Sequence, residues 1–130
     1  MQQPWICYGQ QDGPSGQAID NPKSNLAGVL GEVSLPYVVP PGKILVLKGW
    51  GIEAYESIAG SFVLVPWLGE GPATNDKCLH SVLASAQSNS ASGFEYHLPA
   101  GTKLNVRIMC SEAGNPVAGW WISGSLEDVV

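Results

Sequence analysis

A turn that leads into an alternating strand occurs twice in this chain, and it constrains the fold more than any other feature. The second copy, over 98–110, reads Leu-Pro-Ala-Gly-Thr-Lys-Leu-Asn-Val-Arg-Ile-Met-Cys, a Pro-x-Gly turn followed by alternating apolar and polar residues. The first copy, over 39–47, reads Val-Pro-Pro-Gly-Lys-Ile-Leu-Val-Leu. Alternation with a period of two is typical of a half-buried antiparallel strand. The repeat therefore predicts that both halves of the chain are built from turn-and-strand units.

The two strands differ in how their faces are predicted to be used. In the second strand one face is apolar and consists of Leu104, Val106, Ile108 and Cys110. The first strand is apolar on both faces, which predicts burial on both sides or contact with another subunit. It runs into Gly49-Trp50-Gly51, and glycines on both sides of a tryptophan predict a bulge or bend where the strand changes sheets.

The spacing of turn residues predicts the fold class. The 130 residues include 16 Gly and 10 Pro, which suits many short strands in one domain and argues against long helices. We expect about seven or eight strands, arranged as a two-sheet antiparallel sandwich of jelly-roll type. An immunoglobulin-like sandwich is the alternative, although its Cys-Trp-Cys spacing is missing. The stretch 85–93 is predicted to be a small-residue loop that contributes nothing to the core.

Residues 1–36 lack a period of either two or 3.6, and we interpret them as an extended N-terminal arm that precedes a β-sandwich domain over 37–130. A short strand is expected near residues 5–8. Trp5, Ile6 and Tyr8 are unusual for a disordered tail. The prediction is therefore an arm that docks on a neighbouring subunit or on another protein.

Charge and composition exclude several classes of partner. The formal net charge is −5 and Lys and Arg do not cluster, so the basic stripe of a nucleic-acid-binding protein is missing. No apolar run reaches the roughly 18 residues of a membrane span, and the N-terminus does not resemble a secretory signal. Three cysteines at wide spacing, Cys7, Cys78 and Cys110, predict free thiols in a reducing cytoplasm. A bridge from Cys7 to Cys110 or Cys78 in an oxidised particle is the alternative.

The sequence nominates no residues for chemistry. The two histidines are His80 and His97, and we expect His97 to face solvent on the polar side of a strand. Cys78 and His80 share a predicted strand face, but a zinc site needs further ligands at recognisable spacing. The Gly-x-Ser-x-Gly motif of many hydrolases is missing. We therefore predict no catalytic residues, no metal ligands, no cofactor and no enzymatic activity.

The tryptophans are the remaining candidates for recognition, because tryptophan combines a large apolar ring with a hydrogen-bond donor. Trp120 and Trp121 are adjacent, so on a strand they face opposite sides and one of them must be exposed or interfacial. We assign Trp50 and Trp120 to the core. The residues predicted to contact a partner are Trp5, Tyr8, Trp67 and Trp121.

Two stretches, 38–52 and 94–128, carry a resemblance to a known group. The Val-Pro-Pro-Gly-Lys opening of the first strand and the ending Trp-Ile-Ser-Gly-Ser-Leu-Glu over 121–127 resemble small trimeric jelly-roll proteins of phage particles. That group includes capsid decoration proteins, head-fibre domains and trimers of the TNF or C1q type. The resemblance implies a homotrimer that binds a larger lattice and has no catalytic activity.

These observations lead to a first hypothesis and an alternative. The first is a viral structural protein that decorates or cements a phage capsid as a homotrimer, made in the host cytoplasm and located on the virion surface. Its partners would be the major capsid protein or other virion proteins. The alternative is a carbohydrate-binding module or adhesin tip in which Trp67 or Trp121 stacks on a glycan. A small hydrolase has no support in the residues.

Overall fold

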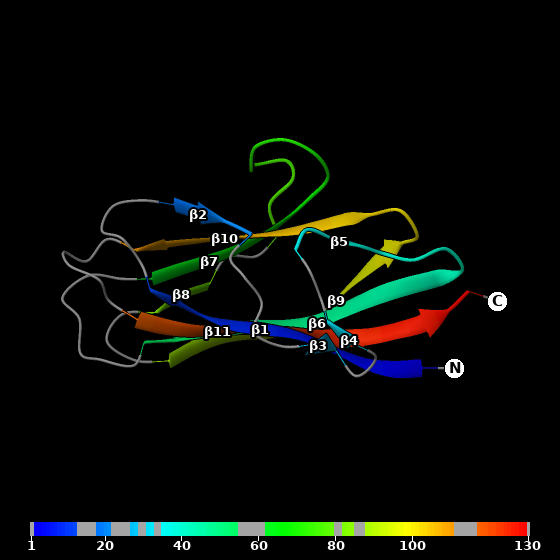
Figure 1. Ribbon diagram of the computed structural model, residues 1–130, viewed down its shortest axis with the longest axis horizontal. Coiled ribbons are helices and arrows are strands. Elements are labelled where there is room, and N and C mark those ends of the chain that lie inside the picture. The colour runs from blue at the N-terminus through cyan, green and yellow to red at the C-terminus, as the bar shows by residue number, and fades with distance from the viewer. Residues whose placement is uncertain are drawn as a thin grey trace.

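Two antiparallel β-sheets lie one above the other in the computed structural model of the chain (Figure 1). The structure describes residues 2–12, 18–21, 27–28, 31–32, 35–54, 62–79, 82–84, 88–110 and 117–129. The predicted two-sheet antiparallel sandwich is confirmed. Stacking the two sheets buries the apolar inner faces of their strands against each other.

The four-stranded sheet has the spatial order β1-β11-β6-β9. Its strands are β1 (Gln2–Asp12), β6 (Lys43–Ala54), β9 (Ser88–Pro99) and β11 (Val117–Asp128). The five-stranded sheet has the order β2-β10-β7-β8, and a further strand, β5, also pairs with β10. Its strands are β2 (Ala18–Asp20), β5 (Tyr37–Val38), β7 (Phe62–Leu68), β8 (Val82–Ala84) and β10 (Lys103–Cys110). The short strands β3 (Ala27–Gly28) and β4 (Gly31–Glu32) form a separate ladder.

The N-terminal stretch contains a full strand of the sandwich. β1 pairs with β11 along its whole length, from Gln2 opposite Glu127 to Asp12 opposite Val117. Trp5 and Cys7 are buried in the core. Residues 2–12, which we expect from the sequence to form an extended arm with a short strand near residues 5–8, therefore belong to the sandwich, because these two side chains fill the space between the sheets. The remainder of the predicted arm lies partly in β2 to β4, and much of it falls outside the described residues.

The core forms between the inner faces of the two sheets. In the described part of the chain it consists of Trp5, Cys7, Val39, Leu45, Leu47, Trp50, Ile52, Leu64, Leu98, Leu104, Val106, Ile108, Trp120, Ile122 and Leu126. The predicted buried face of β10 is confirmed at Leu104, Val106 and Ile108, whereas the side chain of Cys110 lies outside the described residues. The assignment of Trp50 and Trp120 to the core is also confirmed. Phe94 and Tyr96 pack beside Trp50, with ring centroids 4.6 and 5.9 Å from it.

The predicted bulge is present in β6, at Lys48. The pairing of β6 with β11 passes from Leu47 opposite Gly124 to Gly49 opposite Ser123, which leaves Lys48 unpaired. The sequence predicts that the strand changes sheets at this bulge, and this part of the prediction is wrong. β6 continues in the four-stranded sheet as far as Ala54. A bulge adds local twist and shifts the register by one residue, so β6 remains paired with β11 on both sides of Lys48.

β9 is longer than the sequence predicts, and β7 contains a proline. β9 begins at Ser88, so the predicted loop over 85–93 is wrong from that residue onward, and Ala91 packs against the core. β7 continues through Pro66 to Leu68. Proline is tolerated where no ladder hydrogen bond is needed. β8 pairs with β7 only from Phe62 to Leu64, so Pro66 lies beyond the end of that ladder.

Candidate contact surface

Two of the four residues predicted to contact a partner lie side by side on the outside of the sandwich. Tyr8 of β1 and Trp121 of β11 are paired in register. Because Trp120 and Ile122 point into the core, Trp121 between them points outward, and its side chain is half-buried. The prediction that Trp120 and Trp121 face opposite sides, one in the core and one exposed or interfacial, is confirmed.

The indole ring of Trp121 is seated on two glycines of β6. A Cβ atom built on Gly51 would stand 2.7 Å from the Cε2, Cζ2 and Nε1 atoms of Trp121. A Cβ atom built on Gly49 would stand 3.7 Å from Cζ3 of the same ring. Packing an aromatic ring over glycines of a neighbouring strand covers backbone that would otherwise lack a side chain. The ring therefore extends across β6 instead of standing away from the sheet.

The surroundings of Trp121 define a surface that we call the Trp121 face. It comprises two adjacent rows across the four strands, Ile6-Ser123-Gly49-Ser92 and Tyr8-Trp121-Gly51-Ser90. All eight residues are uncharged. Serine and glycine surround the two aromatic rings, so no long charged side chain stands within these two rows.

Charged groups are found at the border of the Trp121 face. Lys48 and Glu53, both exposed, lie at its two ends on β6. On β9, Glu95 and His97 share an exposed hydrogen bond, with Oε2 of Glu95 3.2 Å from Nε2 of His97. The side chain of His97 is 61% exposed, which confirms that it faces solvent. An uncharged centre with a charged border is the usual composition of a protein–protein interface.

The other two predicted contact residues, Trp5 and Trp67, lie inside the fold. Trp5 is 5% exposed and its ring centroid lies 5.2 Å from that of Tyr37; burial raises the pKa of this tyrosine. Trp67 is 2% exposed and belongs to the five-stranded sheet. The guanidinium carbon of Arg107 lies 5.8 Å from the centre of its ring, a distance that allows a cation–π interaction. Both tryptophans therefore offer a partner very little surface.

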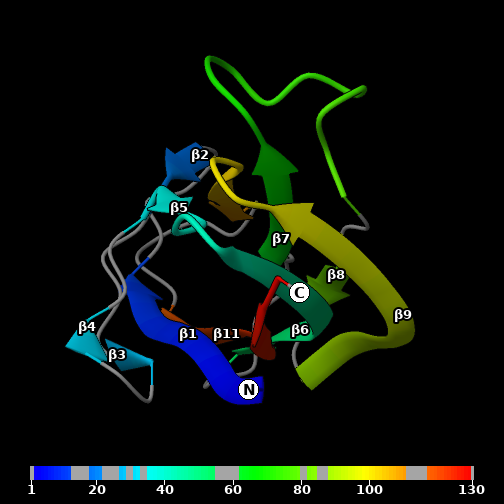
Figure 2. The same ribbon diagram turned by 90° about the vertical axis from the view of Figure 1, so that its right-hand side faces the viewer.

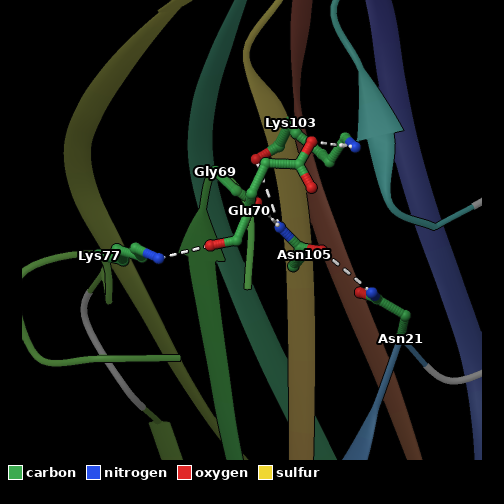
Figure 3. Close-up of polar contacts among 6 residues, drawn as sticks. All are labelled: Asn21, Gly69, Glu70, Lys77, Lys103 and Asn105. Carbon is green, nitrogen blue, oxygen red and sulfur yellow. Dashed lines mark hydrogen bonds and ion pairs between the residues drawn. The ribbon is translucent and has the colours of Figure 1, made fainter. Parts of the chain in front are cut away.

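A polar cluster joins the end of the five-stranded sheet to the segment after β7 (Figure 3). Asn105 is 5% exposed, and its Nδ2 donates to the carbonyl oxygen of Gly69 at 2.9 Å. Its Oδ1 accepts a hydrogen bond from Nδ2 of Asn21 at 3.0 Å. The backbone N–H of Asn21 donates to the carbonyl oxygen of Val106, and the backbone N–H of Val106 donates to Oδ1 of Asn21. These bonds satisfy a buried amide, which would otherwise be costly to bury.

The same cluster includes two lysines that converge on Glu70. Lys103 pairs with the Glu70 carboxylate, and Lys77 donates to the Glu70 carbonyl oxygen (Figure 3). The segment over 69–79 projects away from both sheets (Figure 2), and these contacts hold it to β10. Every polar group named here has a partner within the chain, so we interpret the cluster as structural. Sequence reasoning missed it, because Asn21 and Asn105 are distant in sequence.

The remaining candidates for chemistry receive no support. In the described part of the chain, no three His, Cys, Asp or Glu residues are grouped so that they could hold a metal ion. His80 lies outside the described residues, so its predicted proximity to Cys78 is not resolved. None of the described segments forms a helix long and apolar enough to cross a membrane.

The fold and this surface define a two-sheet antiparallel β-sandwich with an uncharged aromatic patch on one outer face. No family model matches the chain, and no curated protein matches it. Among solved structures it is similar to a chain in the structure of the infectious bursal disease virus Gt strain, at 10% identity and a TM-score of 0.29. That match covers 96% of this chain and 32% of the viral one, so the chain spans about a third of its length.

Proposed function

We propose that this chain is a structural protein of a phage particle, which decorates or cements the capsid as a homotrimer and has no catalytic activity. The observation that supports this function is the Trp121 face. It presents Trp121 and Tyr8 at the centre of an uncharged surface, on a chain whose net charge is −5.

An exposed aromatic residue in an uncharged patch favours protein contact over chemistry. Tryptophan and tyrosine are enriched at the centres of interfaces, where they bury much area and lose little side-chain entropy. The seat on Gly49 and Gly51 fixes the Trp121 ring before any partner arrives. A fixed ring reduces the ordering cost of association, so the face is suited to contact with another protein subunit.

Cementing a capsid in this way depends on several weak contacts acting together. Besides its subunit interface, each subunit of a trimer presents an identical outer surface to the capsid, and a capsid presents repeated binding sites at fixed spacing. Once one contact has formed, the others form at a high effective concentration. The acidic charge of the chain is compatible with the outer surface of the particle, away from packaged nucleic acid.

The solution mass under reducing conditions tests the trimer on which this proposal depends. Light scattering on a size-exclusion column should give three times the chain mass of 13.7 kDa. Covalent cross-linking at matched concentration should give a ladder that ends at three chains. A mass of one chain at the highest soluble concentration would contradict the proposal.

A glycan is the second candidate partner, because Trp121 and Tyr8 are flanked by the hydroxyl groups of Ser90, Ser92 and Ser123. Aromatic rings beside hydroxyls suit stacking and hydrogen bonding to a sugar ring. Screening a glycan array with the wild type and with Trp121→Ala tests this candidate. We would then expect saturable binding that the variant loses. If sugars at millimolar concentration do not bind the wild type, the glycan candidate is wrong.

A further inference from the structure

We infer that the Trp121 face is the surface on which a second copy of this chain packs. The inference rests on the proposed function, because a trimer requires a subunit interface. It adds which residues form that interface and which charges flank it.

The first argument is electrostatic. The chain carries 11 acidic and 6 basic residues, so copies of it repel each other over most of their surface. Burying a carboxylate against another carboxylate is strongly unfavourable, since both lose their hydration and neither gains a partner. The two rows of the Trp121 face contain no charged residue. Two acidic copies can meet there without burying like charges.

The second argument concerns Lys48 at the border of this face. The bulge leaves Lys48 out of the ladder and exposed, and no ion-pair partner for it is found among the described residues. By contrast, Lys43 pairs with Asp128 and Lys103 pairs with Glu70. An unpaired cation beside an uncharged patch favours an acidic neighbour. A second copy of this chain, with its excess of carboxylates, provides one.

The third argument is the shape that the glycine seat gives to the surface. With Trp121 lying against Gly51 and Gly49, the largest side chain of the face covers β6 instead of projecting from it. Ser90 and Ser92 on β9 are small and exposed. Packed protein layers approach to about 10 Å only when facing side chains fit between each other. The low relief of this face allows a neighbouring copy to approach closely.

The test compares charged substitutions inside and outside the face, in the full-length chain. Ser92→Glu places a carboxylate in the face, and Lys48→Glu reverses the border charge. Val38→Glu adds the same group on the five-stranded sheet, where Val38 is 50% exposed. Sedimentation equilibrium should show a dissociation constant at least tenfold larger for the first two variants. Val38→Glu should associate like the wild type.

Hydrogen exchange on the unmodified protein provides a second measurement. Amides near Trp121 and Ser123 should become more protected as protein concentration rises, and those of the turn at Ala100 and Gly101 should not change. If the wild type associates but neither charge variant weakens it, this inference is wrong and the proposed function stands. If the wild type is a monomer, the proposed trimer itself is contradicted, and this inference with it. Circular dichroism spectra identical to the wild type confirm that each variant is folded.

Discussion

The indole ring of Trp121 occupies the space in which a side chain at position 51 would stand, with three of its ring atoms 2.7 Å from an ideal Cβ on Gly51. Gly51→Ala should therefore displace the ring and destabilise the fold by about 1–3 kcal/mol, the usual cost of overpacking. Urea unfolding gives the free energy, and the tryptophan emission of the folded variant should shift as the ring moves.

Repeating the substitution in a chain that already carries Trp121→Ala separates the clash with the Trp121 ring from other effects of a methyl group at position 51. In that background Gly51→Ala should cost much less than in the wild type, since the ring that it displaces is gone. If Gly51→Ala lowers the free energy of unfolding equally in the two backgrounds, the packing of Trp121 on Gly51 is contradicted.

Gly124 allows a sharper version of the same test. A Cβ on Gly124 would stand 2.0 Å from the carbonyl oxygen of Val46, and a backbone atom of a paired strand cannot swing aside. We expect Gly124→Ala to cost about 3 kcal/mol or more and to exceed the cost of Gly51→Ala. Thermal unfolding of the two variants in parallel checks the order. A melting temperature of Gly124→Ala equal to that of the wild type would disprove the close approach of β6 and β11.

Asn105 should be the most costly polar residue of the cluster in Figure 3. Asn105→Ala removes the bond to Gly69 and leaves Asn21 without its acceptor, so we expect a loss of about 1–3 kcal/mol. Asn75→Ala, at an exposed turn position, is the matched control and should change stability very little. Urea unfolding of both variants makes the comparison. Similar losses in the two variants would contradict the structural interpretation of the cluster.

The pair formed by Lys43 and Asp128 predicts that the stability of the fold depends on pH under acidic conditions. The hydrogen bond from Lys43 lowers the pKa of the Asp128 carboxyl from 3.8 to about 2. Because the folded pKa is the lower one, this contribution to stability is present above pH 3.8 and is lost as the pH falls towards 2. Carbon NMR titration of the wild type should give the low value, and Lys43→Gln should return it towards 3.8. A wild-type pKa near 3.8 would contradict the pair.

Local patterning was sufficient to predict the sandwich. The alternation in β10 and β11 identifies the buried faces, and adjacent Trp120 and Trp121 had to separate, one inward and one outward. Register was not predictable, because the pairing of Tyr8 with Trp121 and the placement of Gly51 beneath the ring depend on strands that are distant in sequence. The full extent of β1 was not predicted for the same reason. A strand that is completed by a partner at the other end of the chain carries little periodicity of its own.

Whether each candidate contact residue lies in the core or on the outside was predictable for only half of them, for a related reason. Tryptophan is as common in cores as at interfaces, and composition cannot separate the two. Trp5 and Trp67 are buried, Tyr8 and Trp121 share an outer face, and only the assembled sheets distinguish these cases.

The pairing of β1 with β11 also determines the order in which the molecule can form during synthesis. β1 is translated before its ladder partner β11, and more than a hundred residues separate Trp5 from Gly124 opposite it. Trp5 and Cys7 therefore have no sheet to join until β11 has left the ribosome. Pairing between the ends of a chain carries the largest loop-closure entropy and slows folding. The buried side chains Trp5 and Cys7 must therefore wait for their strand partner while the residues between β1 and β11 are synthesised.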